Sequence, residues 1–595
     1  MMKIDTTLKK TFGFKKFRPH QKEIISQLLE GRDVFASLPT GGGKSICYQL
    51  PALHMEGITI VLSPLVALMK DQVDGARESG IEAYCLNSSL SAADSSHVYR
   101  ALENNQVKLL YISPERFAID EFIETLKRFK VDFVAVDEAH CVSEWGHDFR
   151  PDYLSLSRIR EHFPGAVIAA FTATATLKVQ EDIISLLKLN NPYTVRASFN
   201  RQELYYRIVP KNGANKQISD FICKHKNQSG IVYRLSRADV EKTASYLSGK
   251  GIRALPYHAG LPTKTREKNQ DLFNRDEVDV VVATIAFGMG IDKSNIRYVI
   301  HGDLPKSIEG YYQETGRAGR DGMKSECLLL YSGGDISKIH FFIDKIRDEK
   351  EKKRASRNLN NMASLASVNV CRRKQILEYF DEDHEGNCGS CDICNGEAEQ
   401  VDGTEDAQKI LSAIIRTNQV FGIAHIIDIV RGADTEKIRK FGHNEIKTWG
   451  VGKEKSKSWW RSIINELIGQ KHIFQDRDHY NSLKINSSGA EILYGRSPFV
   501  VLMKKETKQE EKLSFREVDY NENLFARLKE IRTELAREKG LPPYIVFSDK
   551  TLKEMSSLKP DDETAMLRVS GVGERKMEQY GYFFLKEIRI FLGYK

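Results

Sequence analysis

The sequence predicts an α/β protein in which two parallel-sheet lobes are followed by smaller, mainly helical modules. Short apolar runs such as residues 133–136 are too short for surface helices and are typical of strands buried on both faces of a parallel sheet. Such runs alternate with helical patterns over residues 1–200 and again over residues 201–334. At 595 residues, the chain is also too long for a single hydrophobic core.

The composition narrows the class of protein. A hydrophobic content of 41% and a charged content of 29% fit a globular protein, and a net charge of +8 permits nucleic-acid binding without requiring it. The opening MMKIDTTLKK has no apolar core, and the apolar stretch 58–69 is broken by Ser63 and Pro64. We therefore expect neither a signal peptide nor a membrane partner.

In the first lobe, two carboxylates, Asp137 and Glu138, follow the apolar run 133–136. Ligands of open α/β sheets bind beyond the carboxyl ends of the strands. One carboxylate there can hold Mg²⁺, and its neighbour can orient a water for attack on a phosphate. A solvated strand end is the alternative, so the interpretation depends on a phosphate-binding loop upstream.

Residues 38–45, LPTGGGKS, follow an apolar run and precede a helical pattern. Glycines let backbone N–H groups approach phosphate, Lys44 can reach the β and γ oxygens, and Ser45 can ligate Mg²⁺. The general P-loop pattern has glycine where Leu38 stands, and a chance glycine-rich turn is the alternative. Together with the acidic pair, the loop predicts nucleotide binding through Thr40, Gly41, Gly42, Gly43, Lys44 and Ser45.

An aromatic and amide group precedes this loop. Gln21 begins an amphipathic helical pattern, and its amide can pair with N6 and N7 of adenine. Phe14 and Arg18 can stack on the ring. Aromatic residues of a hydrophobic core are the alternative interpretation.

Further strand ends in this lobe carry hydroxyl groups. Residues 62–73 and 111–116 each contain the end of a strand-like run, then Ser-Pro, then a helical pattern, which predicts a turn with proline at the first helical position. Residues 171–176, FTATAT, form another hydroxyl-rich strand end. Hydroxyls and helix N-termini at such ends can hold the phosphates of a nucleic-acid strand.

The order LPTGGGKS, DEAH, FTATAT resembles superfamily 2 helicases. The segment 141–153, CVSEWGHDFRPDY, resembles the aromatic-rich loop of RecQ helicases. Aromatic and basic residues interleaved in a loop suit base stacking combined with phosphate contact. We expect Trp145, His147, Phe149 and Arg150 to contact DNA and to couple its binding to hydrolysis. The resemblance implies that both lobes are RecA-like.

In the second lobe, YYQETGRAGRDG places Gln313, Arg317 and Arg320 at helical spacings, which predicts adjacent positions on one helix face. Arginine keeps its charge and can grip two phosphate oxygens. The resemblance implies that Arg320 is an arginine finger acting across the cleft on ATP. Arg234-Leu235 stand where the RecQ pattern usually has Cys-Asn, which puts strand contacts there in doubt.

Four of the nine cysteines lie close together in residues 335–400, which favours a reducing compartment and a metal site over a disulfide framework. Four thiolates, the first on a helix and three in a loop, predict a closed, structural zinc site. An iron–sulfur cluster is the alternative, but the spacing lacks the ferredoxin run of close cysteines. RecQ proteins carry such a module after the second lobe. The ligands are Cys371, Cys388, Cys391 and Cys394.

The remaining chain divides into three parts. Short helices and a hairpin at residues 474–485 resemble the RecQ winged-helix domain over residues 401–503. Residues 504–519 are charged and predict a linker. Residues 520–595 are helical in pattern and resemble the HRDC domain, with a Gly-Val-Gly turn at residues 571–573 that could offer N–H groups to phosphate.

The resemblance implies an ATP-dependent DNA helicase of 3′-to-5′ polarity, acting in DNA recombination, repair and replication, including the SOS response. Its expected cofactors are ATP, Mg²⁺ and Zn²⁺, with Ser45 and Asp137 holding Mg²⁺. The expected partners are single-stranded and partially duplex DNA, single-stranded-DNA-binding protein and recombination proteins, in the cytoplasm at the nucleoid. A nucleic-acid-binding scaffold without hydrolysis and an RNA helicase are the alternatives. The expected catalytic residues are Lys44, Asp137, Glu138, Arg317 and Arg320.

Overall fold

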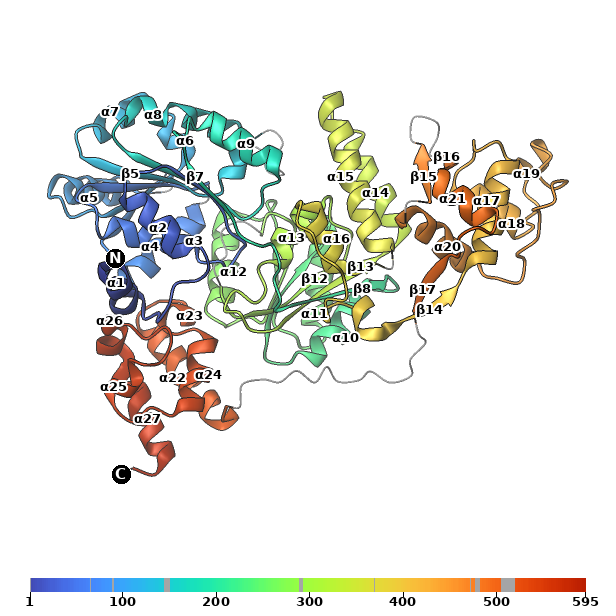
Figure 1. Ribbon diagram of the computed structural model, residues 1–595. Coiled ribbons are helices and arrows are strands. Elements are labelled where there is room, and N and C mark those ends of the chain that lie inside the picture. The colour runs from blue at the N-terminus through green and yellow to red at the C-terminus, as the bar shows by residue number, and fades with distance from the viewer. Residues whose placement is uncertain are drawn as a thin grey trace.

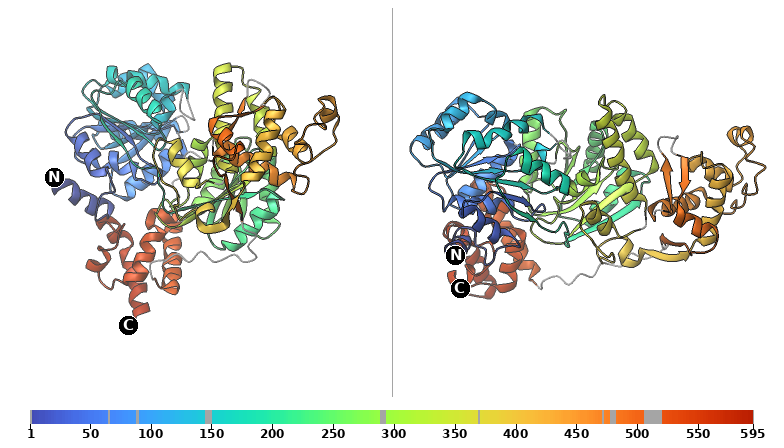
Figure 2. Two further views of the ribbon diagram at one scale, coloured as in Figure 1. Left: turned by 45° about the vertical axis from the view of Figure 1, so that its right-hand side comes forward. Right: turned by 45° about the horizontal axis from the view of Figure 1, so that its top comes forward.

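Two α/β lobes lie side by side, and smaller modules extend from them (Figure 1). The computed structural model describes residues 2–64, 66–87, 90–143, 150–287, 293–368, 370–470, 472–476, 482–504 and 520–594. Both views in Figure 2 keep the C-terminal helices beside the N-terminal helix and the first lobe. Among the described helices, none combines the length and apolar character needed to cross a membrane.

The first lobe is built on a seven-stranded sheet of order β3-β4-β2-β5-β6-β1-β7, and every strand pair is parallel. Apolar side chains cover both of its faces and form two separate clusters with the flanking helices. The strands are β1 (Val34–Ser37), β2 (Ile58–Leu62), β3 (Ala83–Leu86), β4 (Leu109–Ile112), β5 (Val131–Val136), β6 (Val167–Thr172) and β7 (Tyr193–Arg196). The helices are α1 (Met2–Phe12), α2 (Gln21–Leu29), α3 (Lys44–Ala52), α4 (Val66–Glu78), α5 (Ala92–Glu103), α6 (Pro114–Phe117), α7 (Asp120–Leu126), η1 (Ala139–Val142), η2 (Pro151–Arg158), α8 (Ile159–His162) and α9 (Leu177–Leu186).

One of the two Ser-Pro turns shows how sequence sets a helix start. Ser113 ends the loop after β4, and its hydroxyl accepts a hydrogen bond from the Arg116 N–H at 3.4 Å. Pro114 occupies the first helical position, where the missing N–H costs nothing. The Ser113 hydroxyl is therefore used as a helix cap, in addition to any contact it makes with a nucleic-acid strand.

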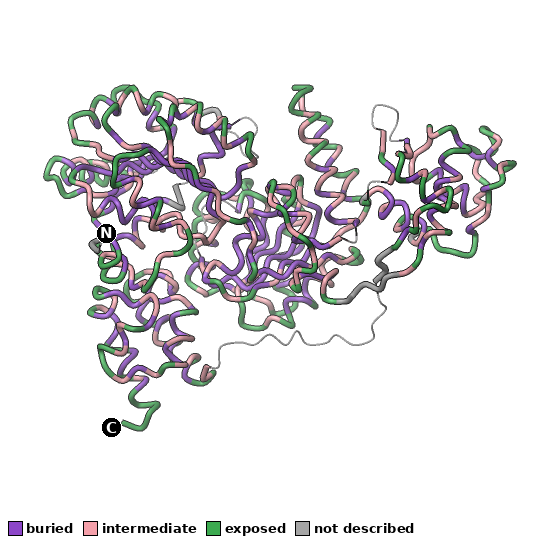
Figure 3. Tube along the Cα trace, viewed as in Figure 1, coloured by how far each residue is buried: buried purple, intermediate pink, exposed green. Residues whose placement is uncertain are grey.

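The second lobe is built on a six-stranded parallel sheet of order β10-β11-β9-β12-β13-β8. Figure 3 shows that the interiors of both sheets are buried. The two parallel-sheet lobes confirm the predicted fold class. The strands are β8 (Leu204–Pro210), β9 (Ser229–Tyr233), β10 (Ala254–Tyr257), β11 (Val280–Ala283), β12 (Ile296–His301) and β13 (Ser325–Tyr331), and the helices are α10 (Ala214–Lys224), α11 (Arg237–Ser248), α12 (Thr263–Asn274) and α13 (Ile308–Thr315).

The cysteine-containing segment shares a core with the second lobe. Leu365, Leu377 and Phe380 belong to the same buried cluster as Tyr206 and Tyr311 of that lobe. This segment therefore packs on the second lobe and shares its hydrophobic core. Its elements are α14 (Gly333–Ile343), α15 (Glu349–Ser367), α16 (Arg372–Tyr379) and η3 (Ile393–Glu397).

The module formed by residues 398–504 has a hydrophobic core of its own, in which Trp460 is fully buried. Its indole N–H donates to the Gly452 carbonyl at 2.9 Å, so this tryptophan has a structural role. The predicted hairpin is present as an antiparallel strand pair, and a second antiparallel pair closes the module. The elements are β14 (Ala398–Asp402), α17 (Thr404–Arg416), α18 (Ile423–Val430), α19 (Glu436–Lys440), α20 (Lys457–Gly469), β15 (Ile473–Asp476), β16 (Ser482–Ile485), α21 (Ser487–Leu493) and β17 (Val500–Lys504).

Residues 520–594 form a helical bundle, called here the C-terminal bundle, which contacts both lobes. The Gly571 N–H donates to the Gly13 carbonyl at 3.0 Å, and the Tyr580 hydroxyl donates to Glu78 of lobe 1 at 2.8 Å. The Gly-Val-Gly turn is therefore packed against lobe 1, which corrects the expectation that this N–H is open to a phosphate. Its elements are α22 (Glu522–Glu538), α23 (Pro543–Val546), α24 (Asp549–Leu558), α25 (Glu563–Met566), α26 (Glu574–Lys576), η4 (Met577–Gly581) and α27 (Tyr582–Leu592).

Candidate functional site

A cavity of about 580 Å³ lies where the two lobes and the C-terminal bundle meet. This volume is in the range of small-molecule sites. It brings together almost all the residues predicted to bind nucleotide, although they come from distant parts of the sequence. The predicted residues lining it are Phe14, Arg18, Gln21, Thr40, Gly41, Gly43, Lys44, Ser45, Asp137, Glu138, Gln313, Arg317 and Arg320.

The predicted phosphate-binding loop joins the end of β1 to the start of α3. Gly41 and Gly43 have φ values of +80° and +82°, a left-handed conformation that glycine adopts without strain. Gly42 does not line the cavity, and its N–H donates to the Pro39 carbonyl at 2.8 Å, which tightens the loop. The loop therefore presents the N-terminus of α3, with Lys44 and Ser45, to the cavity.

Gln21 is buried beside this loop and connects it to the residues before α2. Its amide oxygen accepts from the Arg18 N–H at 2.8 Å, and its amide nitrogen donates to the Gly43 carbonyl at 3.0 Å. Burial lowers the pKa of Arg18, and the neighbouring Arg201 cation lowers it further. Gln21 thus orders the phosphate-binding loop, and its pairing with adenine stays a prediction.

The acidic pair lies at the end of β5, as predicted. The Glu138 N–H donates to Asp137 Oδ1 at 2.9 Å, and Glu138 has a φ of +48°, which is unusual for a residue with a side chain. The buried His140 ring lies 3.4 Å from Glu138 Oε2 and 3.0 Å from the Thr172 hydroxyl. His140 therefore connects the acidic pair to the hydroxyl-rich end of β6. Strained backbone of this kind is concentrated at functional sites.

The arginines of lobe 2 line the opposite wall, but their backbone differs from the prediction. Helix α13 ends at Thr315, so Arg317 and Arg320 lie in the turn that follows. Gly316 is the C-cap residue, and Gly319 has a φ of +64°, which an α-helix cannot contain. The expected shared helix face is therefore wrong, although both side chains do reach the cavity. We call residues 316–320 the arginine turn.

The loop predicted to bind DNA is described only at its end. Trp145, His147 and Phe149 lie outside the described residues. The Arg150 N–H donates to the Cys141 carbonyl at 3.0 Å, and its guanidinium donates to the Pro64 carbonyl at 3.2 Å. Arg150 thereby connects this loop to the first Ser-Pro turn, another predicted strand contact.

Arg234, the departure from the RecQ pattern, belongs to a buried charge network. Its guanidinium donates to Asp303 at 2.8 Å, and Lys211 bridges Asp303 at 2.7 Å and Asp335 at 2.6 Å. Burial alone would raise the pKa of Asp303, but the Arg234 and Lys211 cations lower it to about 2. Arg234 therefore stabilises lobe 2 internally.

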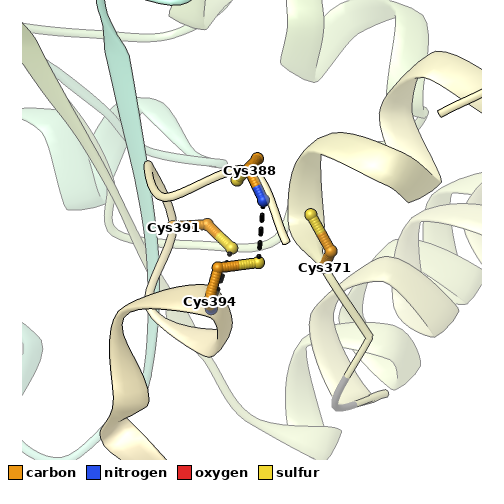
Figure 4. A group of neighbouring side chains, drawn as sticks. All are labelled: Cys371, Cys388, Cys391 and Cys394. Carbon is orange, nitrogen blue, oxygen red and sulfur yellow. Dashed lines mark hydrogen bonds between the residues drawn. The ribbon is translucent and has the colours of Figure 1, made fainter. Parts of the chain in front are cut away.

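The four predicted metal ligands converge beside β8, the edge strand of the second lobe, where Cys391 pairs with Tyr206 (Figure 4). Their sulfur atoms all lie within 4.8 Å of one another, and tetrahedral zinc with bonds of about 2.3 Å requires sulfurs roughly 3.8 Å apart. Cys371 is the N-cap of α16 and not inside a helix as predicted. The Cys388 N–H donates to Cys394 Sγ at 3.3 Å, which favours thiolate character. The residues fit a structural zinc ion.

The C-terminal bundle contributes several residues to the nucleotide cavity that sequence reasoning did not identify. Burial lowers the pKa of Lys576 to about 8, although Glu78 of lobe 1 opposes this shift. The Lys576 ammonium donates to the Ile545 carbonyl within the bundle. No local sequence pattern marks these residues, because they reach the cavity only through the docking of the bundle. They are Tyr544, Ile545, Ser548, Lys550, Thr551, Ser570 and Lys576.

Comparison with known proteins gives the family. The ATP-dependent DNA helicase RecQ of Pasteurella multocida is 42% identical over 97% of this chain and 92% of that protein. The chain belongs to the RecQ family. The RecQ helicases of Haemophilus influenzae and Bacillus subtilis are 41% and 40% identical, each over 98% of this chain and over 95% and 97% of their own lengths.

Domain families characteristic of RecQ proteins match successive stretches of the chain. The zinc-binding match covers the four cysteines, so the RecQ zinc module is present. The RQC match covers the module that contains the predicted winged helix, and the HRDC match covers the C-terminal bundle. The matches are DEAD/DEAH box helicase at 18–183, Helicase conserved C-terminal domain at 213–322, RecQ zinc-binding at 333–395, RQC domain at 397–512 and HRDC domain at 521–588.

Proposed function

We propose that this RecQ-family chain is an ATP-dependent DNA helicase that uses ATP hydrolysis to move along one strand in the 3′-to-5′ direction and to unwind duplexes. One observation carries the proposal: a single cavity holds the phosphate-binding loop and acidic pair of lobe 1 opposite the arginines of lobe 2. Hydrolysis in such a cavity depends on the apposition of the lobes. Cycles of ATP binding and release would therefore open and close the cleft.

The roles of the cavity residues follow from their chemistry. Lys44 would neutralise the β and γ phosphates of ATP, while Ser45 and Asp137 would hold Mg²⁺, which would supply further positive charge to offset that of the phosphates. Glu138 orients the attacking water. Arg317 and Arg320 stabilise the charge that develops on the γ-phosphate in the transition state, a contribution of roughly 10³–10⁵ in rate for an arginine finger.

The base of the nucleotide would occupy the part of the cavity near α2. Phe14 and Arg18 offer stacking surfaces there, and Gln21 and Gln313 offer amides. The backbones of Thr40, Gly41 and Gly43 would supply N–H donors to the phosphates, while the Gly42 N–H stays bonded to the Pro39 carbonyl and tightens the loop. A zinc ion held by the four cysteines would have no part in this chemistry, because four thiolates would leave no open coordination position.

DNA contacts are assigned to the residue 145–150 loop, with Trp145 and Phe149 stacking on bases and His147 and Arg150 binding phosphate. We assign the units as residues 1–200, 201–334, 335–400, 401–503 and 520–595, with a linker at 504–519. Work in recombination, repair and replication, the SOS response, interaction with single-stranded-DNA-binding protein, and a cytoplasmic, nucleoid-associated location belong to the same proposal. They rest on the family alone.

Two assays test the function. ATP hydrolysis is measured with and without single-stranded DNA, for the wild type and for Glu138→Gln. The variant should bind nucleotide and lose hydrolysis, whereas Glu56→Gln, an exposed partner of Lys130, should behave as the wild type. Absence of hydrolysis in the wild type would favour a non-hydrolysing scaffold.

The second assay measures unwinding of duplexes that carry a 3′ or a 5′ single-stranded tail, made of DNA or of RNA. We expect unwinding from the 3′ DNA tail. Unwinding only from the 5′ tail would contradict the proposed polarity, and a preference for RNA would favour an RNA helicase.

A further inference from the structure

Arg201 lies in the segment that joins the lobes, between β7 and β8, and it does not line the nucleotide cavity. Its side chain is only 6% exposed. One guanidinium nitrogen donates to the Thr40 carbonyl at 2.5 Å and to the Gly316 carbonyl at 3.2 Å, and the other donates to the Ala318 carbonyl at 3.0 Å. Its Nε donates to Glu203. One buried cation therefore binds three backbone carbonyls from two lobes.

These carbonyls belong to the phosphate-binding loop and the arginine turn, and both segments contribute residues to the lining of the nucleotide cavity. Thr40 begins the glycine-rich part of the phosphate-binding loop, and Gly316 and Ala318 lie on either side of Arg317. The two segments are also in close contact, because a Cβ built on Gly41 would lie 3.3 Å from the Arg320 Cα. Arg201 thus sets how the arginine turn lies against the phosphate-binding loop.

The backbone of Arg201 is held by the second lobe and its zinc module. Arg373, on the helix that Cys371 caps, donates to the Arg201 carbonyl at 2.6 Å and to the Leu204 carbonyl at 2.8 Å. The Leu204 N–H also donates to the Arg201 carbonyl at 3.1 Å. Arg201 therefore moves with lobe 2, and its bond to Thr40 is the one that separates when the lobes part.

We propose that Arg201 is a positioning residue that brings the arginine turn into register with the phosphate-binding loop when the cleft closes, and that Arg373 of the zinc module holds it in place. This inference rests on the proposed ATP hydrolysis at the same cavity. A guanidinium suits the task because its donors form a rigid fork, whereas a lysine offers a single, mobile ammonium. Because Arg201 does not line the cavity, its removal should act on the closed, reacting arrangement of the lobes more than on nucleotide affinity.

The test compares Arg201→Ala and Arg201→Lys with the wild type and with Arg253→Ala, which loses only an exposed pair with Asp279. Single-stranded-DNA-stimulated ATP hydrolysis gives kcat and KM, and a fluorescent ADP analogue gives nucleotide affinity. For Arg201→Ala we expect kcat to fall at least tenfold while affinity changes less than threefold, because small misplacements of reacting groups cost large factors in rate. Arg201→Lys should lose less activity than Arg201→Ala but should not reach the wild-type kcat. Arg253→Ala should keep the wild-type kcat and nucleotide affinity.

Two further measurements separate positioning from a general structural role. Millimolar guanidinium should partly restore hydrolysis by Arg201→Ala, with zinc content unchanged. The double variant Arg201→Ala/Arg320→Ala should lose little more than Arg320→Ala alone, since residues that act through one another are not additive. Wild-type kcat in a folded Arg201→Ala, or fully multiplicative losses in the double variant, would overturn the inference. If Arg201→Ala does not fold, a wild-type kcat in Arg201→Lys would overturn it. A wild type without hydrolysis would instead defeat the proposed function itself.

Discussion

Gly13→Ala is predicted to release the C-terminal bundle from the first lobe. Gly13 has a φ of +70°, and a Cβ at this position would lie 2.5 Å from both the Gly573 nitrogen and the Val572 carbonyl carbon. These are backbone atoms, so the bundle must move away by about 1 Å to restore ordinary van der Waals contact. A hydrogen bond of 3.0 Å that is lengthened by this much lies beyond the N–H···O range, which ends at about 3.2 Å.

The magnitude follows from the bonds at this contact. The retreat breaks the hydrogen bond from the Gly571 N–H to the Gly13 carbonyl and the one from the Tyr580 hydroxyl to the Glu78 carboxylate. A neutral bond and a bond to a charged group together contribute roughly 2–4 kcal/mol. The docking equilibrium should therefore shift by roughly 30- to 700-fold, since about 1.4 kcal/mol is a factor of ten.

Gly31→Ala is the matched control for this prediction. Gly31 lies in the same lobe with a φ of +82°, and no atom lies within 4 Å of the Cβ position. Both variants carry the left-handed strain of about 1–2 kcal/mol, but only Gly13→Ala collides with the bundle. Hydrogen exchange of peptides covering residues 571–573, with X-ray scattering in solution, measures docking. Equal exchange and equal radius of gyration in the two variants would refute the reasoning.

Four further outcomes are expected. Cys391→Ser should lower zinc below one per chain and reduce solubility, because the binding energy of a structural zinc is folding energy; a soluble variant with full unwinding would contradict this. Arg320→Ala should bind ATP yet turn it over at least tenfold more slowly, measured by steady-state hydrolysis, and a smaller loss would point to Arg317. Trp145→Ala should keep DNA binding and basal hydrolysis but lose most stimulation by single-stranded DNA; full stimulation would remove this residue from coupling. The free energy of unfolding should rise as pH increases from about 8 toward the ordinary lysine pKa, because burial lowers the pKa of Lys576 to about 8 in the folded chain; Lys576→Met should remove this increase from urea-unfolding curves, and an unchanged increase would exclude Lys576 as its cause.

Sequence patterns predicted the parts of this molecule that depend on local chemistry. The strand before Asp137 and the loop before Lys44 were recognisable because buried parallel strands and phosphate-binding turns impose a local residue pattern. The helical placement of Arg317 and Arg320 was wrong because residue spacing was used without weighing the glycines of the turn. Gly316 and Gly319 end the helix in a way that spacing alone does not reveal.

Contacts between distant segments could not be predicted in this way. Arg201 binds carbonyls, which every residue possesses, so no side-chain pattern identifies its partners. The contact of Gly13 with Gly573 joins residues at opposite ends of the chain. Likewise, the cavity residues contributed by the bundle reach their places through tertiary packing and not through local sequence.

Residues 505–519 connect the bundle covalently to the preceding module, so the bundle and lobe 1 bind each other within one molecule. Their interface therefore needs less binding free energy than an interface between two separate molecules. A short tether gives a binding partner an effective concentration on the order of millimolar. An interface too weak to join two separate molecules at micromolar concentration can therefore stay occupied within one chain. Dilution should not undock the bundle, and a detached copy supplied in solution should compete poorly for the same surface. The residues of the C-terminal bundle that line the nucleotide cavity should therefore stay in place at any protein concentration.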